Sequence, residues 1–225
     1  MKHIAKKKQN EPATLKAYRE TTPNATYSGF TDSDQFLKKA LLEEQGHLCA
    51  YCNGRISLKL NENGKPRIEV EHYLSQDENP EKDLDYENML GVCNGISTQK
   101  KEHCDKSKKA KQLQKLDPRH VSIESILTYS LKGSLKPVKT DIAIEADIQL
   151  LNLNDSFIVN SRKLAMDEAL KELSAKYPER QWTKYLFDKE IENWQSKHGG
   201  KFRPYCNAAV WFLNLLKQKS KYPTK

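Results

Sequence analysis

The sequence of 225 residues contains no apolar run that approaches the roughly 20 residues a membrane-spanning helix needs, which excludes a helical membrane protein. Its opening stretch, MKHIAKKKQNEP, is basic but has no apolar segment of the kind found in secretory signal peptides. We therefore expect a cytoplasmic protein whose thiols stay reduced. Internal repeats and long low-complexity tracts are also absent.

Apolar residues are scarce, at 37% of the chain, and charged residues make up 30%. Disorder is nevertheless not expected, because 3 Trp, 10 Tyr and 6 Phe recur among evenly spaced Leu and Ile residues. The length permits one large domain or two small ones, with a core that needs no disulfides. The 5 cysteines of a reduced chain therefore point to metal binding or chemistry.

The net charge of +8 is concentrated in two segments. Residues 1–10 hold four lysines and no acidic residue, and residues 100–120 hold seven lysines and one arginine against three acidic residues. A local cationic stripe is what a protein needs to neutralise phosphates, although lysine-rich segments are as often only solvated surface. The acidic stretch at 71–87 fits either a cation site near a phosphate or a polar loop.

Turn signals divide the first half of the chain into short elements. A capping-box pair predicts a helix that opens at Thr31 and stops near Gly46. Residues 55–70 contain two strand-like runs around Asn63-Gly64, which predicts a β-hairpin, and the polar residues after them predict a loop. Residues 105–116 place apolar side chains at helical spacing and end at an Asp-Pro pair, which predicts a lysine-rich helix.

Beyond Pro118 the pattern becomes mainly helical. Alternating residues before Gly133 suggest a second hairpin, and helical spacing then recurs in several segments up to a last helix opened by Pro204. That helix, CNAAVWFLNLL, is apolar nearly all round and is expected in the core. We expect an α+β chain with a basic tail (1–30), a central domain (31–118) and a mainly helical C-terminal region (119–225).

The cysteines form two pairs, Cys49 with Cys52 in a CxxC and Cys93 with Cys104 ten residues apart. Four thiolates on two loops can meet at the corners of a tetrahedron around zinc. Such binding contributes roughly 10 kcal/mol or more, which short polar segments need in order to fold. The alternatives are a redox CxxC, which lacks a surrounding βαβ pattern, and buried unpaired thiols. Cys206, in the apolar last helix, is expected to be an inert core residue.

Side chains suited to phosphodiester hydrolysis lie among these cysteines: Glu71, His72, Asn88, His103 and Asp105. An imidazole can take a proton from water near neutral pH, and carboxylates can hold magnesium or manganese against a phosphate. Taken singly, each residue has an ordinary explanation as an exposed histidine, a surface acid or a turn asparagine. Their order among the four cysteines favours hydrolysis.

The strings CAYC, IEVEHYLSQ, DYENMLGVCNG and EHCDKSKK resemble the HNH nucleases of the ββα-metal class. More specifically, they resemble the PtuB-type proteins of Septu anti-phage systems and of some retrons. The similarity extends to LLNLND with Arg162 and to FRPYCNAAVWFLNLL, so it covers most of the chain. It implies an α+β fold with a zinc-stabilised ββα-metal (HNH) core in residues 31–118, followed by helices suited to partner docking.

Family roles follow position by position from this resemblance. Glu71 would bind the catalytic metal, His72 would be the general base, and the Asn88 amide would brace the loop that aims the base. The third family motif usually reads Cys-His-x-x-Lys; here Asp105 replaces its histidine, which leaves open whether Asp105, His103 or both bind the ion. The implied structural zinc ligands are Cys49, Cys52, Cys93 and Cys104. The implied nucleic-acid-binding residues are Lys106, Lys108, Lys109 and Lys111.

The reaction implied by the resemblance is one-metal hydrolysis with Mg²⁺ or Mn²⁺, leaving 5′-phosphate and 3′-hydroxyl ends. DNA is the favoured substrate, and structured RNA stays an alternative because no reader of the 2′-hydroxyl can be identified. The implied partner is a PtuA-like ATPase, with a retron RNA or DNA as a further candidate. The competing hypothesis is a zinc-stabilised module that binds nucleic acid or the ATPase without cutting.

Overall fold

The computed structural model describes residues 1–62, 64–96, 100–178 and 182–219. Within these ranges the chain is a mixed α+β protein with three separate two-stranded antiparallel sheets. The helices are α1 (Ala13–Thr21), α2 (Phe36–Glu44), α3 (Asp105–Lys108), α4 (Ile142–Leu150), α5 (Ser156–Lys176), α6 (Lys184–Gln195) and α7 (Cys206–Lys219). The strands are β1 (Ser57–Leu60), β2 (Pro66–Arg67), β3 (Glu69–His72), β4 (Met89–Val92), β5 (Leu127–Tyr129) and β6 (Leu135–Pro137).

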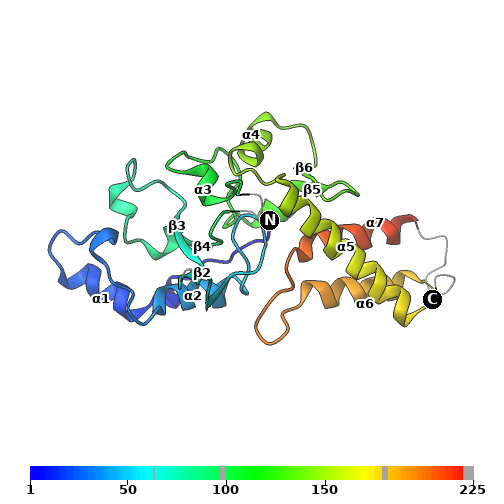
Figure 1. Ribbon diagram of the computed structural model, residues 1–225, viewed down its shortest axis with the longest axis horizontal. Coiled ribbons are helices and arrows are strands. Elements are labelled where there is room, and N and C mark those ends of the chain that lie inside the picture. Colours follow the sequence, from blue (N-terminus) through cyan, green and yellow to red (C-terminus); the bar gives the residue numbers. More distant parts are fainter. Residues whose placement is uncertain (63, 97–99, 179–181, 220–225) are drawn as a thin grey trace.

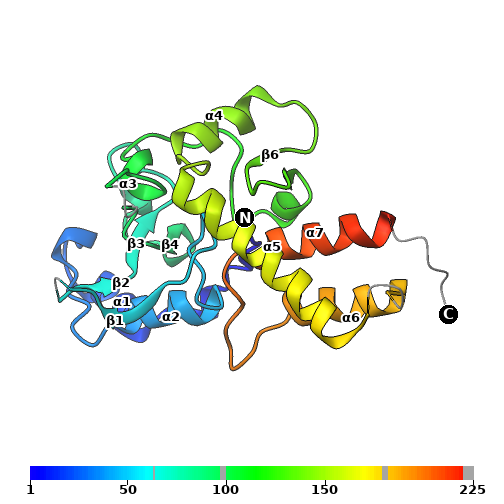
Figure 2. The same cartoon turned by 45° about the vertical axis from the view of Figure 1, so that its right-hand side comes forward.

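The elements divide between a compact body and a helical bundle. In Figure 1 the first two sheets and α1 to α3 lie on one side, the β5–β6 hairpin and α4 lie near the middle, and α5, α6 and α7 extend to the other side. Helix α5 runs from the body into the bundle, where α7 packs against both α5 and α6 (Figure 2). None of the described helices is long and apolar enough to cross a membrane.

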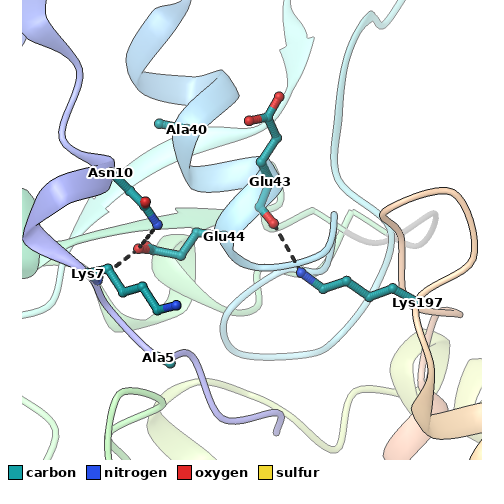
Figure 3. Close-up of a pocket in the computed structure, with 7 residues that line it drawn as sticks. All are labelled: Ala5, Lys7, Asn10, Ala40, Glu43, Glu44 and Lys197. Atoms are coloured by element: carbon teal, nitrogen blue, oxygen red, sulfur yellow. Dashed lines mark hydrogen bonds between the residues drawn. The ribbon is translucent and has the colours of Figure 1, made fainter.

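The N-terminal residues are packed onto the body, so the expectation of a basic tail at 1–30 is wrong. Met1 and Ile4 are buried in the main core. The Glu44 carboxylate of α2 accepts hydrogen bonds from the Lys6 ammonium at 2.7 Å and the Lys7 backbone N–H at 3.0 Å. Figure 3 shows the contact between Lys7 and Glu44 beside a pocket of about 480 Å³. Lys6, one of the four lysines of residues 1–10, is therefore held by a buried carboxylate.

Helix α2 begins at Phe36, and the predicted start at Thr31 is wrong. The Asp32 carboxylate accepts the backbone N–H groups of Leu37 at 3.1 Å and Lys38 at 3.3 Å, so it satisfies the free donors of the first turn. The intervening chain bends through Gln35, which has a φ of 57°. Sequence spacing alone did not show this bend.

The predicted hairpin at 55–70 is present only in part: β1 pairs antiparallel with β2, but Glu69 and Val70, which were expected in its second strand, belong to β3. Asn63, half of the predicted turn signal, lies outside the described residues. The next strand, β3, leaves this hairpin and pairs with β4, placing Glu71 opposite Leu90 and His72 opposite Met89. The loop predicted after His72 connects these two strands and contains two short 3-10 turns.

The lysine-rich helix predicted at 105–116 is wrong in extent, because α3 ends at Lys108 and Lys109 adopts a φ of 56°. The cause lies in α4. The buried Asp147 carboxylate accepts three consecutive backbone N–H groups, from Gln114, Lys115 and Leu116, at 2.7 to 3.0 Å. These donors cannot also form helical hydrogen bonds, and a buried carboxylate without them would be costly.

Buried side chains form one core in the body and another in the bundle. The body core joins residues near the cysteine pairs to Ile123, Tyr129, Ile148 and Ile158, so it continues across the predicted boundary at 118. The bundle core holds Trp194 and Cys206. The predicted second hairpin is present as β5 and β6, and the expectation of a buried Cys206 is confirmed.

Candidate metal centre and adjoining pocket

The sulfur atoms of Cys49, Cys52, Cys93 and Cys104 all lie within 4.8 Å of one another. The Cys49–Cys104 and Cys52–Cys93 sulfur pairs are both 3.9 Å apart. A tetrahedron with Zn–S bonds of about 2.3 Å has sulfur–sulfur edges of about 3.8 Å. The cluster therefore has the donor type, number and spacing to hold a metal ion such as zinc.

The first pair sits on a tight turn between α2 and β1. The Cys49 N–H donates to the Gly54 carbonyl at 2.8 Å, and the Gly54 N–H donates to the Cys52 sulfur at 3.3 Å. Asn53 takes the left-handed conformation that closes this turn, with a φ of 64°. The Ala50 N–H bonds to Gly91 of β4 at 3.0 Å, which fixes the turn against the strand before Cys93.

The second pair is brought together although its spacing is long. His103 donates its backbone N–H to the Gly95 carbonyl at 2.8 Å, and Ile96 and Glu102 form a β-bridge that closes the loop. Gly95 has a φ of +65°, and a Cβ there would lie 2.5 Å from the His103 carbonyl oxygen. The close approach thus requires glycine, and it carries Cys104 back to Cys93.

Burial and sulfur contacts distribute negative charge unevenly over this cluster. Burial alone raises the pKa of Cys49, but hydrogen bonds from the other three thiols outweigh it and bring that pKa well below its ordinary value. Burial and the same contacts raise the pKa of Cys104. One thiolate is thus stabilised by three thiols, and a bound cation would stabilise all four as thiolates.

His103 lies against these sulfurs. Its Nδ1 is 3.3 Å from the Cys104 sulfur and 3.8 Å from the Cys93 sulfur, and its ring stacks on Phe157. Burial lowers the pKa of the imidazole, which favours the neutral ring. His103 is not among the residues that line the pocket at Glu71. The structure therefore separates His103 from Asp105, which the sequence had offered as alternative ligands of one ion.

A pocket of about 250 Å³ opens beside α3 and brings Glu71, His72, Asp105 and Lys108 together. Neighbouring residues in a strand point to opposite faces of the sheet. Glu71 and His72 nevertheless both line the pocket, because His72 is the last residue of β3. Glu71 is 6% exposed, and its Oε1 accepts hydrogen bonds from the Tyr51 hydroxyl at 2.9 Å and the Lys108 ammonium at 2.6 Å. Oε1 is thus held in place.

The carboxyl groups of Glu71 and Asp105 both line this pocket. Burial and the Asp105 carboxyl raise the pKa of Glu71 to about 8, and the Lys108 ammonium only partly opposes this rise. Two carboxylates this close repel each other unless a proton or a cation lies between them. Two hard oxygen donors beside an open pocket fit Mg²⁺ or Mn²⁺, which complete their coordination with water and phosphate oxygens.

His72 is fixed by the loop that follows its strand. Its Nε2 is 2.8 Å from the Asp83 carbonyl oxygen. Because a carbonyl can only accept, Nε2 carries the proton and Nδ1 of the neutral ring is left bare. Burial lowers the pKa of His72, so the neutral ring is favoured near pH 7. A bare, oriented nitrogen is the form that a general base requires.

Asn88 joins the two ends of the same loop. Its Oδ1 accepts the Leu74 N–H at 2.8 Å, and its Nδ2 donates to the carbonyls of Leu74 at 3.1 Å and Lys82 at 3.3 Å. All of these bonds lie within the loop that carries the Asp83 carbonyl. The amide therefore holds the chain that orients His72.

The four predicted nucleic-acid-binding lysines do not form one stripe. Lys108 is 1% exposed and pairs with Glu71 at 2.6 Å. Its predicted place on a nucleic-acid-binding surface is therefore wrong, because its side chain is buried. Lys109 and Lys111 are exposed, and Lys106 pairs with Glu69 at 3.1 Å on the surface. The lysine nearest the predicted catalytic residues thus compensates a buried carboxylate.

Sequence reasoning missed three residues that contact the predicted catalytic pair: Tyr51, Asp83 and Tyr27. Tyr51 lies inside the CxxC, where its spacing gave no sign of a contact with Glu71. Tyr27 contacts His72 from far along the chain, and Asp83 acts through a backbone carbonyl, which no side-chain pattern encodes.

No protein-family model matches the chain, and a search of curated proteins gives no match.

Proposed function

We propose that this protein is a metal-dependent endonuclease of the HNH type, with DNA as the favoured substrate. The observation that carries the proposal is the single pocket lined by Glu71, His72 and Asp105. The succession β3, loop, β4 and α3 places these residues next to the four-cysteine cluster. This is the order of elements expected for a ββα-metal core, and it supports the family resemblance.

Two different ions have fitting donor sets. Zinc would be held by the four cysteines and would serve a structural role, because four thiolates leave no open coordination position. Mg²⁺ or Mn²⁺ would be held by Glu71 and Asp105. When bound, this second ion supplies positive charge that stabilises the phosphate in the transition state.

The protein's own groups have separate tasks in the proposed hydrolysis. His72 takes a proton from the attacking water at Nδ1, because Nε2 already donates to Asp83. Lys108 and Tyr51 fix Oε1 of Glu71 and leave its other oxygen for the pocket. The exposed Lys109 and Lys111 hold the nucleic-acid backbone by charge, without reading bases.

The proposal is tested with zinc-loaded protein, plasmid DNA and added Mg²⁺ or Mn²⁺. The wild type should nick the plasmid and leave 5′-phosphate ends, and His72→Ala should lose nicking by at least about 100-fold with unchanged zinc content. His120→Ala is the matched control, because that exposed histidine contacts Ser122. A His72→Ala protein that cuts at the wild-type rate would contradict the mechanism.

We further propose that the enzyme is the effector of an anti-phage system and works with a PtuA-like ATPase. The resemblance carries this part of the proposal, and the α5 to α7 bundle offers a surface apart from the pocket. Copurification with such an ATPase tests it directly. Cleavage that needs the ATPase would show that the partner activates the nuclease.

A second candidate is a zinc-stabilised binding module that does not cut. One observation favours it: the Lys108 ammonium already pairs with the Glu71 carboxyl group at 2.6 Å. A non-catalytic module would show no Mn²⁺ binding that depends on Glu71 and Asp105, and no cleavage with the ATPase present. Measurement of Mn²⁺ affinity in the wild type and in Glu71→Gln separates the two functions.

A further inference from the structure

The N-terminal segment reaches the histidine of the pocket. The Tyr27 ring meets the His72 ring edge-on, with centroids 4.7 Å apart and planes inclined at 76°. The Tyr27 backbone N–H donates to the Asp83 carboxylate at 2.6 Å. One residue thus touches both the imidazole and the residue whose carbonyl oxygen accepts from it.

Asp83 is held from several sides. Its carboxylate also accepts a hydrogen bond from the Gln76 side chain and lies 3.9 Å from Nε2 of His72. Nearby, the Arg19 guanidinium of α1 donates to the Leu84 carbonyl at 2.8 Å. Arg19 and Tyr27 therefore both bind the loop at Asp83 and Leu84, and the Asp83 carbonyl of this loop accepts the hydrogen bond from His72.

The Tyr27 ring belongs to a packed aromatic group. It lies 6.4 Å from the Phe30 ring, which in turn lies 5.4 Å from the Tyr18 ring. These rings pack against a buried cluster that includes Leu37 and Met89. The Tyr27–His72 contact itself has the edge-to-face geometry that ring pairs prefer, so the Tyr27 ring can hold the imidazole directly.

We propose that Tyr27 is a positioning residue of the active site, which holds the His72 ring in one orientation through its own ring and through Asp83. This inference rests on the proposed function, in which His72 is the base. It also makes residues 13–30 a functional part of the pocket. Loss of the Tyr27 ring leaves the imidazole with its Nε2 hydrogen bond but without this ring contact.

The test compares Tyr27→Ala and Tyr27→Phe with Tyr18→Ala in the full chain. Tyr18 is the matched control, since it packs in the same aromatic group and its hydroxyl donates to Thr26 rather than to the pocket. Melting temperature reports the shared loss of packing. Nuclease kinetics and ¹⁵N-edited NMR of the histidine ring report the orientation and tautomer of His72.

Tyr27→Ala should lower kcat by about 10- to 100-fold with little change in KM, the scale of loss expected from a misplaced catalytic group. Tyr27→Phe should restore kcat, because the ring is kept. In the NMR spectra Tyr27→Ala should replace the single Nε2–H tautomer by averaged signals, and Tyr18→Ala should not.

An unchanged His72 ring signal in Tyr27→Ala, or equal kcat losses in Tyr27→Ala and Tyr18→Ala, would overturn the inference. The NMR measurement needs no enzymatic activity. If the wild type does not cut nucleic acid even with the ATPase present but Tyr27→Ala still frees the ring, the proposed function fails and the positioning contact stands.

Discussion

At the scale of single residues, Glu71 is fixed by two donors, because the Tyr51 hydroxyl and the Lys108 ammonium both donate to its Oε1. Glu71, His72 and Asp105 meet in one pocket as their order suggested. Lys108 was read as part of a charged surface, but it is buried beside Glu71. A charge count cannot separate these roles, since a lysine near an acid has the same sequence signature whether the pair is solvated or enclosed.

Replacement of Lys108 should therefore destabilise the fold. Above pH 8, where Glu71 is ionised, Lys108→Met leaves the Glu71 carboxylate buried without its cation, and loss of one partner from a buried ion pair costs about 3–5 kcal/mol. Lys109→Met, at the exposed neighbouring position, should change stability by less than about 0.5 kcal/mol. Urea unfolding measures both, and equal small losses would show that the pair contributes little.

The paired carboxyl groups predict how Mn²⁺ binding depends on pH. The pKa of Glu71 rises from 4.5 to about 8, so the folded protein holds the proton of this carboxyl group more tightly than the unfolded chain does. The stabilisation of the fold by this proton is full below pH 4.5 and is lost as the pH rises through 8. Mn²⁺ bound by Glu71 and Asp105, as proposed, would need the Glu71 carboxyl group in its ionised form. The rise in melting temperature caused by Mn²⁺ should be small at acidic pH and grow toward alkaline pH.

Glu71→Gln is the control for this prediction, since it removes the titrating carboxyl group and keeps the shape of the side chain. The Mn²⁺ effect in this variant should be weak at every pH. An effect in the wild type that is equally large at acidic and alkaline pH would contradict the carboxylate site.

At the scale of elements, local signals predicted what local forces decide. The CxxC turn, the β1–β2 hairpin and the late helices follow from turn residues and spacing, and the structure contains them. The start of α2 and the end of α3 were missed, because Asp32 and Asp147 bond backbone groups that helical periodicity had assigned to the helix. Gly95 explains how the long second cysteine loop closes, which spacing alone made uncertain.

Removal of the metal from the four cysteines should unfold the body before the bundle. The body core includes Cys49, Cys52 and Cys104, whereas the bundle has a core of its own around Trp194. Hydrogen exchange after chelation should show lost protection in β3, β4 and α3, with α6 and α7 still protected. Equal loss in both parts would show that the molecule unfolds as one unit, and no loss would show that the cluster holds no structural ion.

At the scale of the whole molecule, the division into tail, nuclease domain and helical region was too simple. The Met1 carbonyl accepts a hydrogen bond from Asn207 of α7 at 2.8 Å, and Tyr27 lies against His72. Contacts between residues this far apart have no sequence signature in a single chain. The mixed α+β character was predictable, while the role of residues 1–30 was not.

Charge on the molecular surface predicts the salt dependence of nucleic-acid binding. If the lysines at 106, 109 and 111 each contact a phosphate, replacing all three with glutamine should reduce the slope of log K against log salt by about 0.9 per lost contact. Fluorescence anisotropy with labelled duplex DNA measures the slope. An unchanged slope would place the nucleic acid on another face.

The most direct test of the account is anomalous diffraction from crystals soaked in Mn²⁺, recorded on both sides of the zinc absorption edge. A zinc signal is expected among the sulfurs of Cys49, Cys52, Cys93 and Cys104. A separate manganese signal is expected between Glu71 and Asp105, facing His72. Cysteines without a metal signal, or manganese bound away from these two carboxylates, would contradict it.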